Sequence, residues 1–260
     1  MTPIVILDAG HGGSDPGGGN NTQFTEKDMN LQISLYQYNR FLALNIPVAI
    51  TRTTDVTLTS EARTALVRNS SARYCISNHI NSGGGRGSEV IYSIYGSPTF
   101  PQLIQDALTA EGMPNRRIFT RTLPDNPRLD YYFMHRETGS VETVIVEYGF
   151  ADNALDANKL QQDWRDLAEG VVRAFCTYAK LPYQPPATAT PTSTPKPTTA
   201  PTLAPTTSPG NGADWKQEAV NWLYDQGFLT DEQWRQQPDQ PLPLWAHAVI
   251  LKRLFEKLKP

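Results

Sequence analysis

Three side chains that can bind a metal or move a proton stand at the ends of short apolar runs in this sequence. They are His11, His79 and Glu147. Zinc readily takes two histidines and a carboxylate, and a hydrolytic zinc site leaves its fourth position to water. A carboxylate that is not a ligand can serve as a proton acceptor. The residue types therefore indicate hydrolytic metal chemistry.

Glu26 is a further candidate ligand. Thr25, with Asp28 three residues later, predicts a capping box that opens a helix and places Glu26 in its first turn. The chain has no His-Glu-x-x-His pair, so the ligands must come from separate elements. A histidine at a strand end can equally be a hydrogen-bonded structural residue, and the spacing alone leaves both interpretations open.

The elements that would position these residues follow from periodicity. Short β-rich runs alternate with amphipathic stretches, which predicts an α/β domain with a mostly parallel twisted sheet and helices on both faces. Ligands of such sheets bind beyond the carboxyl ends of the strands, where the candidates would converge. We expect strands near residues 4–9, 48–51, 74–79, 89–95 and 144–149, and helices near 25–42, 59–69 and 157–179.

The composition changes sharply after this domain. Between Pro185 and Pro209, 17 of 25 residues are Pro or Thr, which predicts an extended spacer of up to about 75 Å. We therefore expect a catalytic domain at 1–183, a Pro/Thr-rich linker at 184–211 and a small all-α domain at 212–260.

Charge and targeting features narrow the class of protein. The net charge of −3 leaves no basic domain, which argues against a nucleic-acid partner, and no apolar stretch is long enough to span a bilayer. The N-terminus lacks the pattern of a signal peptide. Cys75 and Cys176 are expected to be free, because nothing indicates an oxidising compartment.

Four blocks of the sequence resemble a known enzyme family. They are Leu7-Asp8-Ala9-Gly10-His11-Gly12-Gly13-Ser14-Asp15-Pro16-Gly17, Thr25-Glu26-Lys27-Asp28-Met29-Asn30-Leu31, Ser77-Asn78-His79-Ile80-Asn81 and Val146-Glu147-Tyr148-Gly149-Phe150. In this order they are similar to the signature blocks of the zinc-dependent N-acetylmuramoyl-L-alanine amidases of the Amidase_3 type. The resemblance covers residues 1 to about 180.

The resemblance implies a function for each matching residue. His11, Glu26 and His79 would bind one Zn²⁺, and Glu147 would be the catalytic general base and acid. The substrate would be peptidoglycan, cut at the amide between the lactyl group of N-acetylmuramic acid and L-alanine. Two alternatives to this amidase function remain: a zinc peptidase that acts within the stem peptide, and a wall-binding module without catalysis.

Further side chains are candidates for supporting the ligands or touching substrate. Ligating histidines usually donate their second N–H to a carboxylate or carbonyl, and each candidate could instead cap a turn or lie at the surface. The candidates are Asp8, Asp15, Asn81, Glu89 and His135. The glycine-rich segment at 10–19 lacks a Gly-Lys-Ser/Thr sequence, so phosphate binding is not indicated; its glycines are expected to keep the zinc site open to a polymer.

The C-terminal segment weakly resembles a single surface-layer-homology repeat. It holds four of the five tryptophans, Trp215, Trp222, Trp234 and Trp245, which are candidates for wall binding or for the core of a three-helix domain. A secondary wall polymer is its expected ligand, and a single repeat suggests a weak dimer. An anchor without an export signal predicts a phage or prophage endolysin, held in the host cytoplasm before lysis and then at the cell wall. A secreted bacterial wall-remodelling amidase is the alternative.

Overall fold

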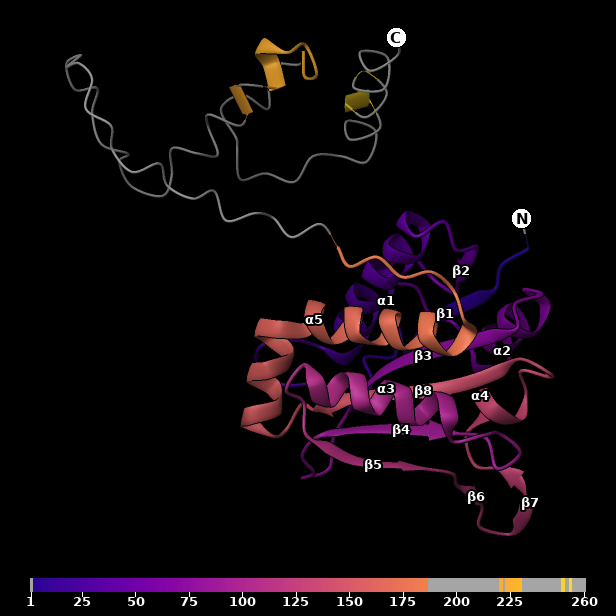
Figure 1. Ribbon diagram of the computed structural model, residues 1–260. Coiled ribbons are helices and arrows are strands. Elements are labelled where there is room, and N and C mark those ends of the chain that lie inside the picture. The colour runs from indigo at the N-terminus through magenta and orange to yellow at the C-terminus, as the bar shows by residue number, and fades with distance from the viewer. Residues whose placement is uncertain (1, 187–219, 222, 231–248, 251–252, 254–260) are drawn as a thin grey trace, which may run out of the picture. The chain divides into compact units, whose positions relative to one another are not determined.

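The computed structural model describes residues 2–186, 220–221, 223–230, 249–250 and 253 (Figure 1). The chain divides into two units, Met1–Thr190 and Pro191–Pro260. The predicted linker and C-terminal domain lie mostly outside the described residues, as do the four tryptophans proposed for wall binding. Their boundaries and their helical fold therefore remain predictions.

The first unit is built on a six-stranded sheet with the order β2-β1-β3-β8-β4-β5. Four of its strands are parallel: β1 (Val5–Ala9), β2 (Val48–Ile50), β3 (Tyr74–Asn81) and β8 (Glu142–Phe150). The other two, β4 (Ser88–Tyr92) and β5 (Asn115–Phe119), are parallel to each other and antiparallel to β8. The predicted mostly parallel sheet is confirmed.

Helices cover both faces of this sheet (Figure 1). The larger core lies under α1 (Glu26–Ala43), α3 (Thr99–Ala110) and α5 (Ala154–Ala179). A smaller core on the opposite face includes Val67 of α2 (Ser60–Asn69) and Met134 of α4 (Phe133–Arg136). This arrangement confirms the predicted α/β class with helices on both faces.

The alternation of side chains in the central strands decides which residues face which core. In β3, Tyr74 and Ile76 belong to the larger core, whereas Cys75 belongs to the smaller one. Successive side chains of a strand point to opposite faces. His79 and, by the same alternation, Glu147 therefore lie on the face that α2 and α4 cover.

Several details differ from the predictions. The hairpin of β6 (Thr122–Leu123) and β7 (Asn126–Asp130) was not predicted, and neither were β5 and α4. The α5 helix begins at Ala154 and is interrupted at Asp163. The predicted capping box is wrong: the Thr25 hydroxyl donates to the Asp28 carboxylate at 2.5 Å, and the Thr25 side chain accepts no backbone N–H.

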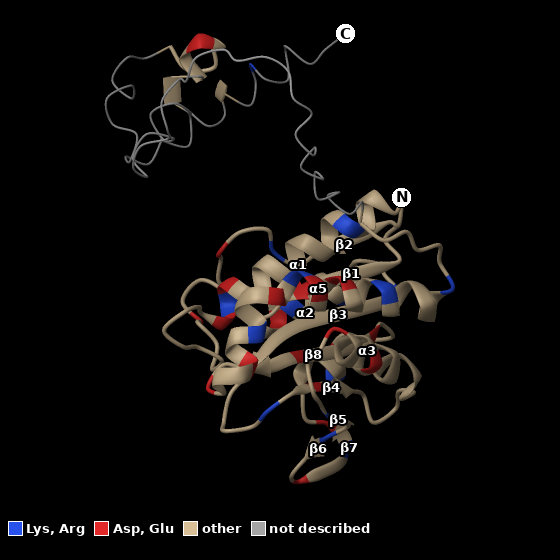
Figure 2. Ribbon diagram, turned by 60° about the vertical axis from the view of Figure 1, so that its left-hand side comes forward, with Lys and Arg blue, Asp and Glu red and all other residues tan. Residues whose placement is uncertain are grey.

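Both cysteines are free and buried, as expected. Within the part of the chain that the structure describes, no helix combines the length and apolarity needed to cross a bilayer. Figure 2 shows acidic and basic residues interspersed along the helices and loops of the first unit.

Candidate metal centre

His11 stands in a tight turn directly after β1. Its backbone φ is +59°, a left-handed conformation that is uncommon for any residue other than glycine. Two buried guanidinium groups hold this turn: Arg63 Nη2 donates to the His11 carbonyl at 2.7 Å, and Arg52 Nη2 donates to the Gly10 carbonyl at 3.0 Å. Strained conformations persist where the surroundings fix them, so these arginines stabilise the position of His11.

Asp8 supports the same turn indirectly, through its ion pair with Arg63. Its carboxylate accepts hydrogen bonds from Arg63 Nη1 at 2.6 Å, Thr51 Oγ1 at 2.8 Å and Ser77 Oγ at 2.7 Å. Burial opposes its ionisation, but the charge of Arg63 and the hydrogen bond from Ser77 hold its pKa below the usual value. Asp8 thus contacts no histidine ring, contrary to the sequence-based suggestion, and acts on His11 through Arg63.

Glu26, the first residue of α1, joins the two histidines. Its Oε1 atom lies 3.2 Å from His11 Nε2 and 3.1 Å from His79 Nδ1. One ligand atom from each of the three residues falls within 4.8 Å of the other two. The two imidazole rings stand nearly perpendicular, with centroids 5.0 Å apart. The structure therefore brings together the three residues that the sequence proposed as ligands.

The charges of this cluster suit a cation. Burial favours the neutral form of Glu26, but its hydrogen bonds from His11 and His79 outweigh burial and hold its pKa well below the usual range. Burial likewise disfavours protonated His11, yet Glu26 and then Asp15 raise the pKa of His11 to about 9. Two imidazole nitrogens and one carboxylate, with a position left for water, form a donor set that fits zinc.

Asp15 orients the first histidine. Its Oδ2 atom accepts a hydrogen bond from His11 Nδ1 at 2.8 Å, which leaves Nε2 directed at Glu26. A carboxylate on the second nitrogen is the usual way in which proteins fix the tautomer of a metal-binding histidine. Among the candidate supporting residues, Asp15 is the one that contacts a ligand ring.

Two glycines of the loop make room for the ligands. A Cβ atom on Gly10 would lie 2.3–2.7 Å from atoms of the His79 ring, and one on Gly17 would lie 2.3 Å from Glu26 Oε2. At these two positions the absence of a side chain allows close packing against the ligands. Backbone N–H groups of the loop donate to Asp55 and Glu26, among others, which uses the donors that a phosphate site would need.

Glu147 lies beside the cluster without belonging to it. It is the register partner of His79 across β3 and β8, and of Glu89 across β8 and β4. Its Oε2 atom is buried and has no hydrogen-bond partner. Burial raises the pKa of Glu147 to about 7, opposed by the charge of His79 and reinforced by Glu26 and Glu89. A carboxylate with a pKa near neutrality is suited to taking up and returning a proton.

A cleft of about 300 Å³ gives access to these groups. It is lined by His11, His79 and Glu147, with Arg63 and Tyr132 among its other residues. Asn81 and Glu89 do not line it. Asn81 Nδ2 donates to Glu89 Oε2 at 3.0 Å, and neither residue is seen to contact a ligand ring in the described part of the chain.

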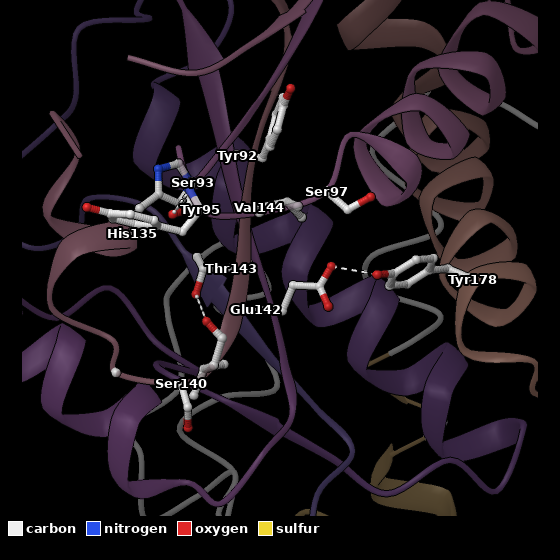
Figure 3. Close-up of a pocket in the computed structure, with 13 residues that line it drawn as sticks. Tyr92, Ser93, Tyr95, Ser97, His135, Ser140, Glu142, Thr143, Val144 and Tyr178 are labelled. Carbon is white, nitrogen blue, oxygen red and sulfur yellow. Dashed lines mark hydrogen bonds between the residues drawn. The ribbon is translucent and has the colours of Figure 1, made fainter. Parts of the chain in front are cut away.

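His135 lies elsewhere and is not among the residues that line the metal cleft. It lines a separate cavity of about 340 Å³, together with Glu142 and Tyr178, whose hydroxyl donates to Glu142 at 2.7 Å (Figure 3). Phe133 and Met134 of the short α4 helix line the metal cleft, whereas His135 of the same helix does not. Burial lowers the pKa of His135 to about 4, so the ring is neutral at pH 7.

Arg52 was not singled out from the sequence, because an arginine after a short strand carries no distinctive spacing. Its role depends on carbonyl groups that are distant in the sequence. Arg52 Nε donates to the Ala9 carbonyl at 3.0 Å, and Nη2 donates to the Lys27 carbonyl at 2.7 Å. The structure is needed to see that this one side chain connects the His11 turn to the first turn of α1.

Comparisons with known proteins agree with this geometry. Residues 5–176 match the family model of Amidase_3, N-acetylmuramoyl-L-alanine amidase. The chain is 34% identical over 180 residues to the N-acetylmuramoyl-L-alanine amidase CwlM of Bacillus licheniformis, covering 66% of this chain and 68% of that protein. It is 33% identical to a sporulation-specific N-acetylmuramoyl-L-alanine amidase of Bacillus subtilis, covering 66% of this chain and 68% of that protein.

A solved structure shows the same fold. The catalytic domain of CwlV, an N-acetylmuramoyl-L-alanine amidase from Bacillus (Paenibacillus) polymyxa var. colistinus, superimposes with a TM-score of 0.60 and 26% identity. The match covers 69% of this chain and 99% of that one. The matched family model spans all four site residues, His11, Glu26, His79 and Glu147. The chain therefore belongs to the Amidase_3 family of N-acetylmuramoyl-L-alanine amidases, which are hydrolases acting on peptidoglycan.

Proposed function

We propose that this chain hydrolyses the amide that joins the lactyl group of N-acetylmuramic acid to L-alanine in peptidoglycan, with one zinc ion held by His11, Glu26 and His79. The observation that carries the proposal is the meeting of these three side chains within 4.8 Å, beside a carboxylate that is not used as a ligand. Membership in the amidase family supports the same bond.

Zinc, when bound, supplies Lewis acidity, which polarises an amide carbonyl and makes water a nucleophile at neutral pH. Glu147, whose carboxylate is not one of the three ligands and lines the same cleft, takes the proton of the attacking water. The same carboxyl group then returns the proton to the departing nitrogen of L-alanine. Asp15 keeps the His11 ring in the orientation that directs Nε2 inward throughout this cycle.

A zinc peptidase cutting within the stem peptide would use the same groups, so the bond must be identified from the products. Purified peptidoglycan is digested, and the new amino termini and reducing ends are measured. Our proposal predicts new L-alanine amino termini without new reducing sugar ends. Termini at any other residue would refute the bond assignment.

The cellular setting is a separate proposal. The relatives named above are bacterial amidases, and one of them carries a sporulation-specific name, which favours a bacterial wall-remodelling role. The alternative is the endolysin role expected from the sequence. Fractionation of cells that express the protein at native level distinguishes them: a remodelling enzyme reaches the wall during growth, whereas an endolysin stays in the cytoplasm until lysis begins.

Residues 212–260 are proposed to anchor the enzyme to the wall, with a secondary wall polymer as ligand. The Pro/Thr-rich composition of the preceding segment supports a tether between two units. Removing residues 212–260 is expected to weaken co-sedimentation with cell walls and to leave activity on soluble muropeptides unchanged. Unchanged sedimentation would contradict the anchor.

A further inference from the structure

A second hollow, of about 460 Å³, adjoins the metal cleft at Glu147. Glu147 and Tyr132 line both, so a molecule bound across Glu147 could occupy the two spaces at once. The second hollow also contains Asn81, Glu89, Arg117 and Arg121. Neither histidine of the metal cluster lines it, and its charged lining consists of two guanidinium groups and two carboxylates.

Arg117 is held in place with part of its guanidinium unused. Its Nε atom donates to Glu89 Oε1 at 2.9 Å, and the group lies 4.0 Å from the centroid of the Phe119 ring. Arg116 Nε donates to the same Glu89 oxygen at 2.6 Å. The single carboxylate of Glu89 therefore pairs with two guanidinium groups, so one of their two positive charges has no carboxylate of its own.

Arg121 adds a second uncompensated charge. Its guanidinium carbon lies 3.7 Å from the centroid of the Tyr131 ring. Among the described residues it forms no ion pair, since the carboxylates near this hollow, Glu89 and Glu147, both lie beyond salt-bridge distance of it. Stacking on a ring fixes the plane of the group, and Arg121 also hydrogen-bonds the Tyr132 side chain, which leaves its remaining N–H groups for a ligand.

The proposed reaction indicates which part of the substrate the N–H groups of Arg117 and Arg121 would contact. Glu147 returns a proton to the departing nitrogen, so the leaving peptide lies on the Glu147 side of the scissile bond. A stem peptide carries free carboxylates, at its C-terminus at least. Planar guanidinium groups bind carboxylates through paired N–H donors, and two such groups in one hollow give specificity for that ligand.

We propose that Arg117 and Arg121 form a subsite that binds a carboxylate of the stem peptide on the leaving-group side of Glu147. This inference depends on the proposed function, since it assigns the peptide half of that substrate. The arginines are specificity residues of the subsite and take no part in proton transfer.

The test compares two soluble muropeptides that differ only in whether the stem-peptide carboxylates are free or amidated. The wild-type enzyme is expected to cut the free-carboxylate substrate with a KM about 10- to 100-fold lower, as for charge-assisted hydrogen bonds. Arg121→Gln should lose most of this preference with little change in kcat, and Arg121→Glu should reverse it. Arg128→Gln, an exposed arginine on β7, is the matched control and should behave as wild type.

The outcomes that would refute the subsite differ from the outcome that would refute the proposed function. Equal KM values for the two substrates in the wild-type enzyme would overturn the subsite without any variant, even if Arg121→Gln failed to fold. An unchanged preference in folded Arg121→Gln and Arg117→Gln would overturn it as well. Absence of new L-alanine amino termini from both substrates would instead refute the proposed function.

Discussion

His11 Nδ1 lies 2.8 Å from Asp15 Oδ2, so the loop that carries one candidate ligand also carries the carboxylate that orients it. Asp15 is exposed, and its other oxygen accepts the Gly17 backbone N–H at 3.1 Å. A single turn thus fixes the tautomer of His11 and the path of the chain toward Glu26.

Asp15→Ala should weaken zinc binding. Loss of the carboxylate that fixes a ligating histidine costs about 10- to 100-fold in metal affinity. The zinc Kd is measured by competition with a chromophoric chelator. Asp125→Ala, an exposed aspartate in the turn between β6 and β7, is the control and should leave the Kd unchanged. Equal affinities for Asp15→Ala and wild type would mean that the hydrogen bond does not support the metal.

Gly10→Ala should displace His79. The added methyl group would lie 2.3–2.7 Å from the ring, closer than non-bonded carbon and nitrogen atoms approach. We expect zinc affinity and activity both to fall by more than about tenfold, as for other residues that position a ligand. Gly18→Ala is the control, because its Cβ would meet only the Ser82 hydroxyl, at 3.3 Å. A zinc-loaded, fully active Gly10→Ala enzyme would show that the ring has room to move.

Asp8→Ala should destabilise the domain. Asp8 is fully buried and Arg63 nearly so, and removing one partner of a buried ion pair costs about 3–5 kcal/mol. The free energy of unfolding is measured in urea on the metal-free protein, so that zinc binding does not contribute. The double variant Asp8→Leu/Arg63→Met should lose less than Asp8→Ala, since it leaves no unpaired charge. A loss below about 1 kcal/mol for Asp8→Ala would contradict a buried, uncompensated arginine.

Zinc affinity should increase with pH up to about 9. The pKa of His11 in the metal-free protein is raised to about 9, so this ring is protonated at pH 7 and must lose its proton to bind a metal. Below this pKa, the affinity should fall about tenfold for each unit of pH, and calorimetry in buffers of different ionisation enthalpy should detect about one proton released per zinc. Affinity independent of pH between 6 and 8 would contradict the protonated cluster.

Glu147→Gln should retain zinc and lose turnover. An amide cannot accept the proton of water, so kcat should fall by about 10²- to 10⁴-fold. In the wild-type enzyme the carboxylate form is the active base, and its pKa is raised to about 7 without metal. A neighbouring dication favours the carboxylate, so kcat/KM should rise with pH and level off at or below pH 7. Glu137→Gln, a partly exposed glutamate paired with Arg136, is the control.

The sheet was predictable from local patterns, whereas the choice of His11, Glu26 and His79 as candidate ligands also needed the resemblance to the amidase family. The apolar runs of β1, β3 and β8 end at polar residues, and parallel strands bring their ends together. The segment from Asn115 to Asp130 was missed because it is rich in charged residues and has little apolar alternation, so β5 and the β6–β7 hairpin leave no clear signal.

The supporting contacts were harder to predict because they depend on three-dimensional proximity. Asp15 is four residues from His11, and its contact could be suggested from the spacing. The role of Asp8 depends on Arg63, which is 55 residues away in the sequence. The position of His135 stayed open from the sequence, because the direction of its side chain depends on one short helical turn that the sequence did not indicate.

The most direct test of the account measures zinc content and peptidoglycan amidase activity on the same preparation. We predict one zinc per chain, loss of L-alanine amino-terminus release after chelation, and recovery of activity when one equivalent of zinc is restored. His79→Ala should contain little zinc and release no L-alanine termini. Full activity in metal-free protein, or in His79→Ala, would contradict the claim that His11, Glu26 and His79 hold the catalytic metal.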